Sequence, residues 1–249
     1  MIVLPEELSG EGLAVIQGRR AALLYELHEL RTGLEVRAAL LGGQRGSATV
    51  LEAAPQKVCL KLRLSQPPCE PVPLALLIAV PRPQTVKKVL QTAAMLGVSS
   101  IHFVPSDNSV KSYLQSKTLA SEAIQQEIVK GLEQCCDSRP PAVVVWQALW
   151  RFMKEGLPSL SPPQKPQALC LLPLTSISKT QNLSALGPIP LSRTVICAIG
   201  PESGWSEREE HDWIKTGFQP ISLGERMLRV ETAVAVLLGQ IALLRAGTE

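Results

Sequence analysis

The chain has 249 residues, of which 45% are hydrophobic and 19% charged, and its formal net charge is +3 at pH 7. This composition is typical of a globular protein, and no apolar run approaches the roughly 20 residues of a membrane span, so the sequence excludes a transmembrane protein. The first ten residues lack the basic-then-apolar pattern of a secretory signal, and we expect a cytoplasmic protein.

The first part of the chain is predicted to form short strands. Apolar and polar residues alternate over 34–38, 48–51 and 58–62, and Gly42-Gly43 is typical of a hairpin turn. Several short strands in close succession predict a small barrel or meander. Residues 1–73 carry eight Lys and Arg against eight Asp and Glu, so their charge permits RNA binding without arguing for it.

A stiff connector separates this part from the rest. Four prolines fall within residues 66–73, and such a segment is extended and resists folding into either neighbour. The length of the chain also favours two domains. We therefore predict one domain over residues 1–73 and a second over 74–249.

Beyond the connector, strands and helices alternate. The predicted order is strand 74–80, a helix from Pro83 to Gly97, strand 101–104, helix 116–135, strand 142–145, helix 146–154, a loop over 157–167, strand 168–172, strand 195–199, strand 220–223 and helix 230–245. Continuous apolar strands separated by helices are typical of parallel sheets that are buried on both faces. The fold class is therefore α/β.

A glycine-rich loop follows the strand that ends at Ile199. It runs from Gly200 to Trp205, and Ser206 and Glu209 then form the pattern of a capping box, so a helix begins directly after it. In a parallel sheet the loops after Leu172, Ile199 and Leu223 converge at one edge, where ligands bind. Spacing alone also fits two ordinary strand-to-helix connections.

The cysteines and histidines do not suggest a metal site. Six cysteines include no C-x-x-C pair, and only three histidines are present as partners. The adjacent Cys135 and Cys136 are interpreted as reduced thiols.

Two segments carry a resemblance to a known family. They are Ile199-Gly-Pro-Glu-Ser-Gly-Trp205 and Ser222-Leu-Gly-Glu-Arg-Met-Leu-Arg-Val-Glu-Thr-Ala233, with weaker echoes at residues 96–98, 133–134 and 139–140. Their order and spacing resemble the paired signature of the bacterial 16S ribosomal RNA uridine-N3 methyltransferases, which belong to the SPOUT class. The alternating first domain is similar to the PUA-like β-barrel of these enzymes.

The resemblance implies a function and an architecture. Residues 1–73 would be a PUA-like β-barrel that binds RNA, and residues 74–249 a SPOUT methyltransferase domain with a trefoil knot. The expected reaction is methyl transfer from S-adenosylmethionine to N3 of a uridine in 16S ribosomal RNA of the small ribosomal subunit. The expected assembly is a homodimer, without metal and without a membrane.

The resemblance also implies site residues. Glycines allow an adenine to approach bare backbone, and apolar neighbours line its pocket. The predicted cofactor-binding residues are Leu172, Pro173, Leu174, Ile199, Gly200, Pro201, Glu202, Gly204, Leu223, Gly224, Met227, Leu228 and Thr232. Arg229 is the catalytic candidate, because its guanidinium group can donate paired hydrogen bonds to the uracil or to a phosphate. Glu231 would orient the Arg229 side chain. The alternative for Arg229 and Glu231 is an ion pair within a helix or between subunits.

Two signature residues have expected structural roles. Glu202 is expected mainly to accept hydrogen bonds from backbone amides and so fix the loop, with a catalytic role as the alternative. Trp205 is expected to pack under the loop.

The sequence departs from the family pattern at several positions. Ser203 replaces a glycine, which would strain the loop if that position requires a positive φ. Met95, Glu29 and the Pro81-Arg82-Pro83 turn stand where the family carries other residues. These departures leave two alternatives open: a SPOUT-fold protein that binds RNA or cofactor without turnover, and a methyltransferase that acts on another nucleotide or RNA.

Overall fold

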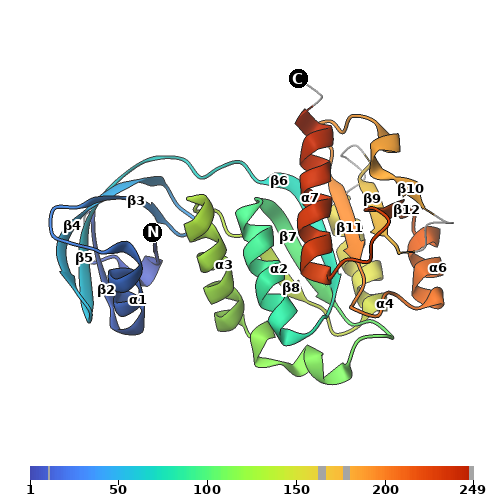
Figure 1. Cartoon of the computed structure of the whole chain (residues 1–249), viewed down its shortest axis with the longest axis horizontal. Helices are drawn as coiled ribbons and strands as arrows, with labels where there is room; N and C mark the ends of the chain where they lie inside the picture. Colours follow the sequence, from blue (N-terminus) through green and yellow to red (C-terminus); the bar gives the residue numbers. More distant parts are fainter. Residues whose placement is uncertain (11, 162–166, 176–179, 247–249) are drawn as a thin grey trace. The chain divides into compact units, whose positions relative to one another are not determined.

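The structure is a computed structural model, and it describes residues 1–10, 12–161, 167–175 and 180–246. The chain forms two compact units (Figure 1). The first comprises Met1–Glu70 with Val129–Pro140, and the second comprises Pro71–Ile128 with Pro141–Glu249. The first unit thus includes a segment that the predicted boundary at residue 73 assigns to the second domain.

The first unit contains a five-stranded sheet with the order β1-β3-β4-β5-β2. Its elements are β1 (Ile2–Val3), a 3-10 turn (Pro5–Glu7), β2 (Leu13–Gln17), α1 (Gly18–His28), β3 (Glu35–Leu40), β4 (Arg45–Ala54) and β5 (Lys57–Gln66). Only β1 and β3 pair in parallel. The three predicted strands and the hairpin turn are confirmed, whereas β2 and α1 were not predicted.

One face of this sheet is the core of the first unit. Because side chains alternate across a strand, Ala48 and Val50 of β4 and Val58 and Leu60 of β5 all point to the same side and are fully buried. Helix α1 contributes Ala21 and Leu24 to the same cluster. The opposite face is more polar and includes Arg37, Ser47 and Lys61.

The second unit contains a seven-stranded parallel sheet with the order β10-β12-β9-β11-β6-β7-β8. The strands are β6 (Val72–Ala79), β7 (Val98–Val104), β8 (Ala142–Val145), β9 (Leu169–Pro173), β10 (Gln181–Asn182), β11 (Val195–Ile199) and β12 (Gln219–Ser222). Every strand pair in it is parallel, which confirms the predicted sheet.

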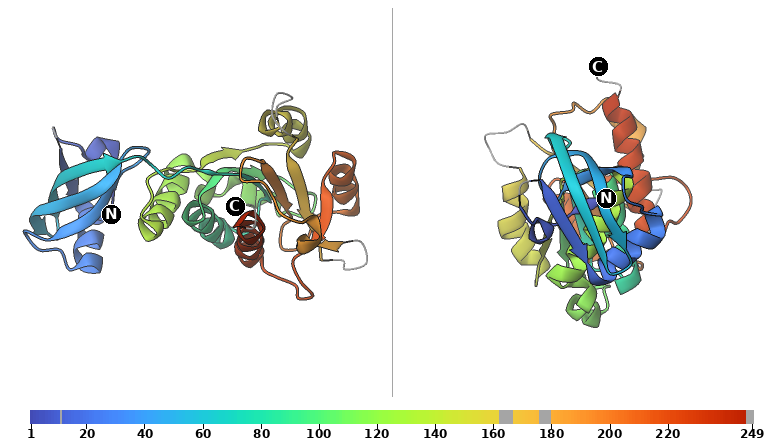
Figure 2. Two further views of the ribbon diagram at one scale, coloured as in Figure 1. Left: turned by 90° about the horizontal axis from the view of Figure 1, so that it is seen from above. Right: turned by 90° about the vertical axis from the view of Figure 1, so that its left-hand side faces the viewer.

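Helices follow the strands of this unit. They are α2 (Pro83–Met95), α3 (Ser121–Cys135), α4 (Leu149–Arg151), a π-helical turn (Phe152–Gly156), α5 (Leu157–Leu160), α6 (Glu207–Lys215) and α7 (Val230–Ala246), with 3-10 turns at Lys111–Gln115, Lys117–Leu119 and Leu183–Leu186. Helices α2 and α7 lie side by side over one face of the sheet, and α4 lies over the other (Figure 2). Helix α3 runs across the division between the units.

Several predicted boundaries in the second unit were wrong. Strand β7 begins at Val98 rather than at residue 101, and the helix predicted over 146–154 begins at Leu149. Leu157–Leu160 was predicted as the start of a loop but forms α5, which continues without a break from the π-helical turn Phe152–Gly156. The rest of that predicted loop, residues 162–166, lies outside the described residues. The helix predicted over 116–135 begins only at Ser121, after the 3-10 turn that ends at Leu119.

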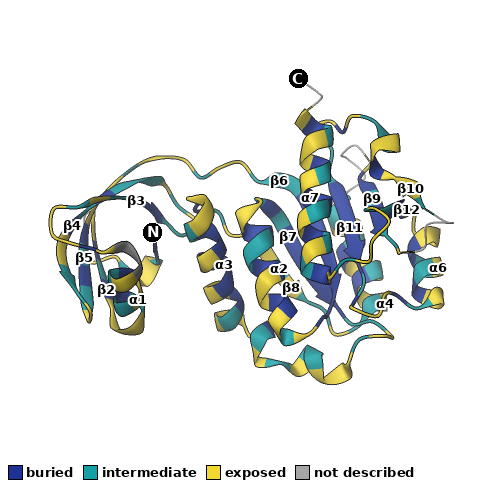
Figure 3. Ribbon diagram, in the orientation of Figure 1, coloured by how far each residue is buried: buried dark blue, intermediate teal, exposed yellow. Residues whose placement is uncertain are grey.

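The central strands carry the core of the second unit (Figure 3). Alternate residues of β6 point to opposite faces, so Ala75, Leu77 and Ala79 pack against the cluster that contains Trp213 and Phe152. All residues of β11 are buried. No helix among the described residues is long and apolar enough to cross a membrane.

Candidate functional site

A pocket of about 270 Å³ lies where β9, β11 and β12 end. Three loops line it: residues 173–175, residues 199–205 and residues 223–228, with Glu210, Val230 and Ala233 behind them. These three strands are neighbours in the parallel sheet, so their carboxyl ends meet at one edge. The predicted convergence of the three loops is therefore present in the structure.

The structure brings most of the predicted cofactor-binding residues to this pocket. Its lining includes Pro173, Leu174, Ile199, Gly200, Pro201, Glu202, Gly204, Leu223, Gly224, Met227 and Leu228. Two predicted residues lie elsewhere. Leu172 is fully buried in the hydrophobic core, and Thr232 is exposed on α7.

The glycines of the first loop have distinct roles. A Cβ on Gly200 would lie 3.0 Å from the backbone nitrogen of Trp205 and 3.2 Å from the carbonyl carbon of Gly204, so the loop folds back tightly over this residue. Gly204 has a φ of +76°, a conformation that other residues rarely adopt. Gly224, in the second signature segment, has a φ of +130°.

Ser203 fits the loop without strain. Among the described residues, the only non-glycine residues with positive φ are Glu29 and Cys136, so Ser203 does not occupy the conformation that would demand glycine. Its hydroxyl donates a hydrogen bond to the carbonyl oxygen of Asn108 at 3.1 Å. The replacement therefore adds an attachment between two loops.

A buried carboxylate holds the loop to its surroundings. Glu209 is 1% exposed, and it forms the predicted capping box with Ser206 at the start of α6. It also accepts hydrogen bonds from the hydroxyl of Ser106 and the backbone amide of Asp107, each at 2.9 Å. One carboxylate thus joins the glycine loop, α6 and the loop after β7.

The loop after β7 was missed by the sequence analysis. The carboxylate of Asp107 accepts hydrogen bonds from Arg208 and from the hydroxyl of Ser206. The side-chain nitrogen Nδ2 of Asn108 donates to the carbonyl oxygen of Gly204 at 3.1 Å. These partners are about 100 positions apart in the sequence, and no local pattern links them. The loop supports the site from outside the pocket.

Glu202 connects the glycine loop to helix α2. Its carboxylate accepts from the backbone amide of Arg82 at 3.1 Å and from the hydroxyl of Thr85 at 3.3 Å. These donors are in the first turn of α2, where amides lack partners within the helix and a negative charge is favoured. Glu202 thus accepts from one backbone amide, as the expected structural role requires, and its role in fixing the loop stays a prediction.

Trp205 packs beneath the loop, as predicted. It is 5% exposed, and its ring meets that of Trp213 edge-on with centroids 5.3 Å apart. Such pairs add stability beyond the area they bury. The glycine loop therefore lies on a rigid aromatic base.

The two catalytic candidates lie at the start of α7. Arg229 is exposed and is not part of the pocket lining, but its neighbours Leu228 and Val230 are. Its carbonyl oxygen accepts from the amide of Ala233 at 2.8 Å, which places Arg229 at the N-cap position of the helix. A cation at this point adds to the partial positive charge of the helix terminus.

Glu231 has a partner that the sequence did not predict. Its carboxylate accepts a hydrogen bond from Nζ of Lys88 on α2 at 3.0 Å. Partial burial opposes ionisation, but hydrogen bonds from its own backbone amide and from Lys88, together with the charges of Lys88 and Arg229, hold the pKa of Glu231 below its ordinary value. Glu231 is therefore ionised at neutral pH and fixes α7 against α2.

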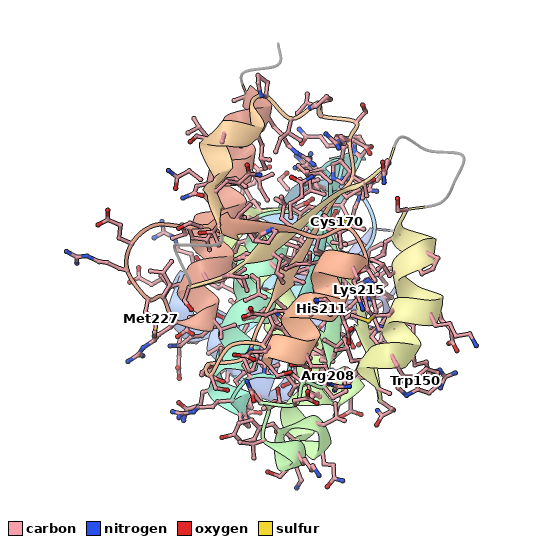
Figure 4. The ribbon with its side chains drawn as sticks, turned by 90° about the vertical axis from the view of Figure 1, so that its right-hand side faces the viewer. Trp150, Cys170, Arg208, His211, Lys215 and Met227 are labelled. Atoms are coloured by element: carbon pink, nitrogen blue, oxygen red, sulfur yellow. The ribbon has the colours of Figure 1, made fainter. Side chains whose placement is uncertain are left out.

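The segment between β12 and α7 is the most open wall of the pocket. Met227 is 81% exposed, and in Figure 4 it projects away from the sheet. Residues 224–227 are all exposed, although the pocket lining includes each of them. This wall can close on a ligand at little cost, because it buries no core residues of its own.

The chemistry of the lining suits a cationic nucleoside. Ile199, Leu223 and Leu228 give an apolar surface for a base, and the loop backbone offers amides and carbonyls. Glu202, Glu210 and Glu225 outnumber Arg226 in the lining, which favours a positively charged group. Across the residues that the structure describes, no cluster of His, Cys, Asp and Glu could hold a metal ion.

Comparisons with known proteins identify relatives over nearly the whole chain. The ribosomal RNA small subunit methyltransferase E of Treponema pallidum is 28% identical over 94% of this chain and 86% of its own length. The protein of the same name from Synechocystis is 26% identical over 93% of this chain and 66% of its own length.

Solved structures show the same fold. A Legionella pneumophila chain described as a methyltransferase in complex with the cofactor SAM has a TM-score of 0.74 at 21% identity, with 99% of this chain and 97% of that chain covered. Ribosomal RNA small subunit methyltransferase E of Neisseria gonorrhoeae, bound to S-adenosyl methionine, has a TM-score of 0.71 at 18% identity, with 98% and 97% covered.

The sequence model of one family matches the segment that contains the pocket and all of its loops. That family is described as the RNA methyltransferase domain, and the match covers residues 68–242. This chain belongs to the RNA methyltransferase domain family.

Proposed function

We propose that this protein transfers a methyl group from S-adenosylmethionine to N3 of a uridine in 16S ribosomal RNA of the small ribosomal subunit. Membership of the RNA methyltransferase domain family supports the reaction type. The names of the Treponema and Synechocystis relatives support the small-subunit substrate, and the Neisseria structure supports the cofactor. We place this activity in the cytoplasm.

The observation that carries the proposal is the shared pocket. Both signature segments, residues 199–205 and residues 222–233, contribute to one cavity, although they are separated by a helix and a strand. Its volume of about 270 Å³ is near the lower end of the range for small-molecule sites, which is roughly 300–1,000 Å³. We assign the predicted residues in its lining to S-adenosylmethionine.

The pocket must mainly position its ligand. When bound, S-adenosylmethionine supplies an electrophilic methyl group, so no protein nucleophile is required. The tight turn at Gly200 and the base formed by Trp205 fix the backbone that would contact the adenosine. Rigid placement of this kind can contribute several kcal/mol to the rate, on the order of 7–11 kcal/mol in the best intramolecular cases.

The acceptor atom sets the second requirement. Uridine N3 carries a proton in neutral water, and negative charge develops on the uracil as that proton leaves. Arg229 lies at the N-terminus of α7, next to Leu228 and Val230 of the pocket. We assign to Arg229 the stabilisation of the uracil anion, since its guanidinium and the helix terminus act in the same direction.

Glu231 acts through position rather than by contact with the substrate. Its carboxylate is held by Lys88, so the first turn of α7 is fixed against α2. This anchor keeps Arg229 at the mouth of the pocket. The Lys88 contact adds to the expectation that Glu231 orients Arg229, which stays a prediction.

We further propose the trefoil knot and the PUA-like barrel. Strand β12 lies between β10 and β9, the amide of Leu174 donates to Ile221, and the amide of Ile189 donates to Leu244 near the end of α7. Leu174 thus contacts β12 and Ile189 contacts α7, which supports a path of the last segment through the connection before β11. The curled mixed sheet of the first unit supports the PUA-like assignment.

We also propose a homodimer. Leu243 on α7 is 74% exposed, and Met227 precedes the same helix. Exposed apolar side chains that form one contiguous patch mark interaction sites, and we assign α7 and the loop before it to such an interface. Sedimentation of the wild type and of Leu243→Glu tests this assembly: we expect a dimer that the substitution weakens, and a wild-type monomer would contradict it.

The residue assignment is tested with Arg229→Ala and Arg229→Lys. Cofactor affinity is measured by calorimetry, and methylation of small subunits by mass spectrometry of nucleosides. We expect affinity within about threefold of the wild type and a loss of turnover of about 100-fold or more in the alanine variant, as for removal of one oxyanion donor. Arg229→Lys should retain part of the wild-type methylation rate, because lysine keeps the positive charge but cannot donate the paired hydrogen bonds of a guanidinium group. Unchanged turnover in Arg229→Ala would remove Arg229 from the mechanism.

A further inference from the structure

Glu210 is a residue of the pocket that the sequence analysis missed. It lies in the first turn of α6 and belongs to the lining of the cavity of about 270 Å³, and it is half-buried there. Within the described part of the chain, its side chain makes no hydrogen bond and no ion pair. Glu210 thus brings an unpaired negative charge to the wall of the pocket.

The other charged residues of this helical turn have partners or face water. Glu209 is held by its hydrogen bonds to the loop after β7, and Arg208 pairs with Asp107. Glu207 is exposed and is not part of the pocket lining. Residues two apart on a helix do not face each other, so Arg208 is not directed toward Glu210. Within this turn of α6, which the structure describes in full, no cation neutralises Glu210.

The other carboxylates of the lining differ from Glu210. The carboxylate of Glu202 is held by two donors from the first turn of α2. Glu225 is exposed, and the exposed Arg226 follows it in the chain, so the charges of these two residues offset each other. Glu210 is therefore the carboxylate of the lining that is free to meet a charged ligand.

We propose that Glu210 binds a positively charged group of S-adenosylmethionine. The cofactor carries two such groups at neutral pH, the sulfonium and the α-ammonium. The attraction between opposite charges increases where water is partly excluded, as it is at a half-buried wall. This inference rests on the proposed function for the identity of the ligand, and it assigns ligand contact to a helix that lies outside both signature segments.

A carboxylate at this position adds a selectivity that the rest of the lining does not provide. Ile199, Leu223 and Leu228 give an apolar surface, and the glycine loop offers backbone groups, which fit the adenosine whether or not the sulfur is charged. Loss of the methyl group turns the sulfonium into a neutral thioether. If Glu210 faces the sulfonium, S-adenosylmethionine therefore binds more tightly than S-adenosylhomocysteine, and the spent cofactor is released more easily.

The test compares the affinities of three ligands by calorimetry on the full-length protein. They are S-adenosylmethionine, S-adenosylhomocysteine, which lacks the sulfonium charge, and methylthioadenosine, which lacks both the sulfonium charge and the ammonium. Glu210→Gln keeps the shape of the side chain and removes its charge. We expect this variant to bind S-adenosylmethionine about four- to tenfold more weakly than the wild type, between the effect of an exposed ion pair and that of a hydrogen bond to a charged group. Its affinity for methylthioadenosine should equal that of the wild type.

The matched control is Glu207→Gln, which removes the same charge from the same turn of α6 outside the lining and should leave all three affinities unchanged. A loss in Glu210→Gln for S-adenosylmethionine alone assigns the contact to the sulfonium, and an equal loss for S-adenosylhomocysteine assigns it to the ammonium. Unchanged affinities in Glu210→Gln, a loss that extends to methylthioadenosine, or an equal loss in Glu207→Gln would overturn the role of Glu210.

The same measurements separate this inference from the proposed function. A wild type that binds S-adenosylmethionine, with the same affinity in Glu210→Gln, overturns the role of Glu210 and leaves the proposed function standing. The expected loss of affinity in a protein that forms no 3-methyluridine on small subunits supports the role of Glu210 and counts against the proposed function. A wild type that binds none of the three ligands would contradict both.

Discussion

The buried carboxylate of Glu209 provides the sharpest test of how the glycine loop is held. Glu209→Ala removes the acceptor for the backbone amides of Ser206 and Asp107 and for the hydroxyl of Ser106. Hydrogen bonds to charged groups contribute about 1.5–3 kcal/mol each. Three bonds at the lower value total about 4.5 kcal/mol, and because water can reach the exposed Asp107 we expect a loss of about 3 kcal/mol.

Urea unfolding followed by tryptophan fluorescence measures this loss. All four tryptophans, at positions 146, 150, 205 and 213, belong to the second unit, so the signal reports that unit. The matched control is Glu207→Ala, an exposed acid in the same helical turn, which should cost only about 0.3–1 kcal/mol through the helix dipole. Equal losses for the two variants, or a loss below about 1 kcal/mol for Glu209→Ala, would refute the account of the loop.

Two other predictions concern the same unit. Gly200→Ala places a Cβ 3.0 Å from the backbone nitrogen of Trp205, and we expect it to lower the free energy of unfolding by about 1–3 kcal/mol. We also expect weaker cofactor binding, measured by calorimetry. An affinity equal to that of the wild type would show that the loop adjusts to the added Cβ without affecting the pocket. His102 is 6% exposed, burial lowers its pKa to about 4, and Nε1 of Trp146 donates to its Nδ1 at 3.2 Å. Since an unfolded histidine titrates near 6.5, this contribution to stability is complete above about pH 6.5 and is lost as the pH falls towards 4, by up to about 3 kcal/mol. Urea unfolding at several pH values should show this component in the wild type but not in His102→Gln, and identical pH profiles would contradict it.

The sequence predicted the second unit well because its signals are local. Strand β8 and strand β11 have the predicted bounds, Pro83 opens α2, and the capping box of Ser206 and Glu209 opens α6. Each of these depends on residues within one turn or one strand. Strand β10 has only two residues and cannot be distinguished from a loop, whereas the edge strand β2 is apolar in four of its five residues and was overlooked.

The loops that line the pocket could be predicted from the sequence, but the residues that hold these loops in place could not. Strand ends and glycines placed the pocket, because parallel neighbours bring their carboxyl ends together. The loop containing Asp107 and the contact between Lys88 and Glu231 join residues far apart in the chain, and no pattern in the sequence indicates them. Leu172 fell outside the lining because it is fully buried in the core, and Thr232 because successive residues of a helix face different ways.

The charge of the first unit shows the same difference. A count over residues 1–73 gives neutrality, whereas the strand register collects Arg37, Arg45 and Arg63 on one face. The pairing of the strands decides on which face of the sheet these charges lie, and no local pattern in the sequence reveals that pairing.

The most direct test of the proposed reaction uses purified protein, S-adenosylmethionine and small ribosomal subunits from a strain that lacks this protein. Nucleosides from the 16S ribosomal RNA are then analysed by mass spectrometry. The account predicts that 3-methyluridine is missing before the reaction and appears after it, and that Arg229→Ala greatly reduces its formation. A full 3-methyluridine signal in the subunits before the reaction, or a methyl group on another atom afterwards, would contradict it.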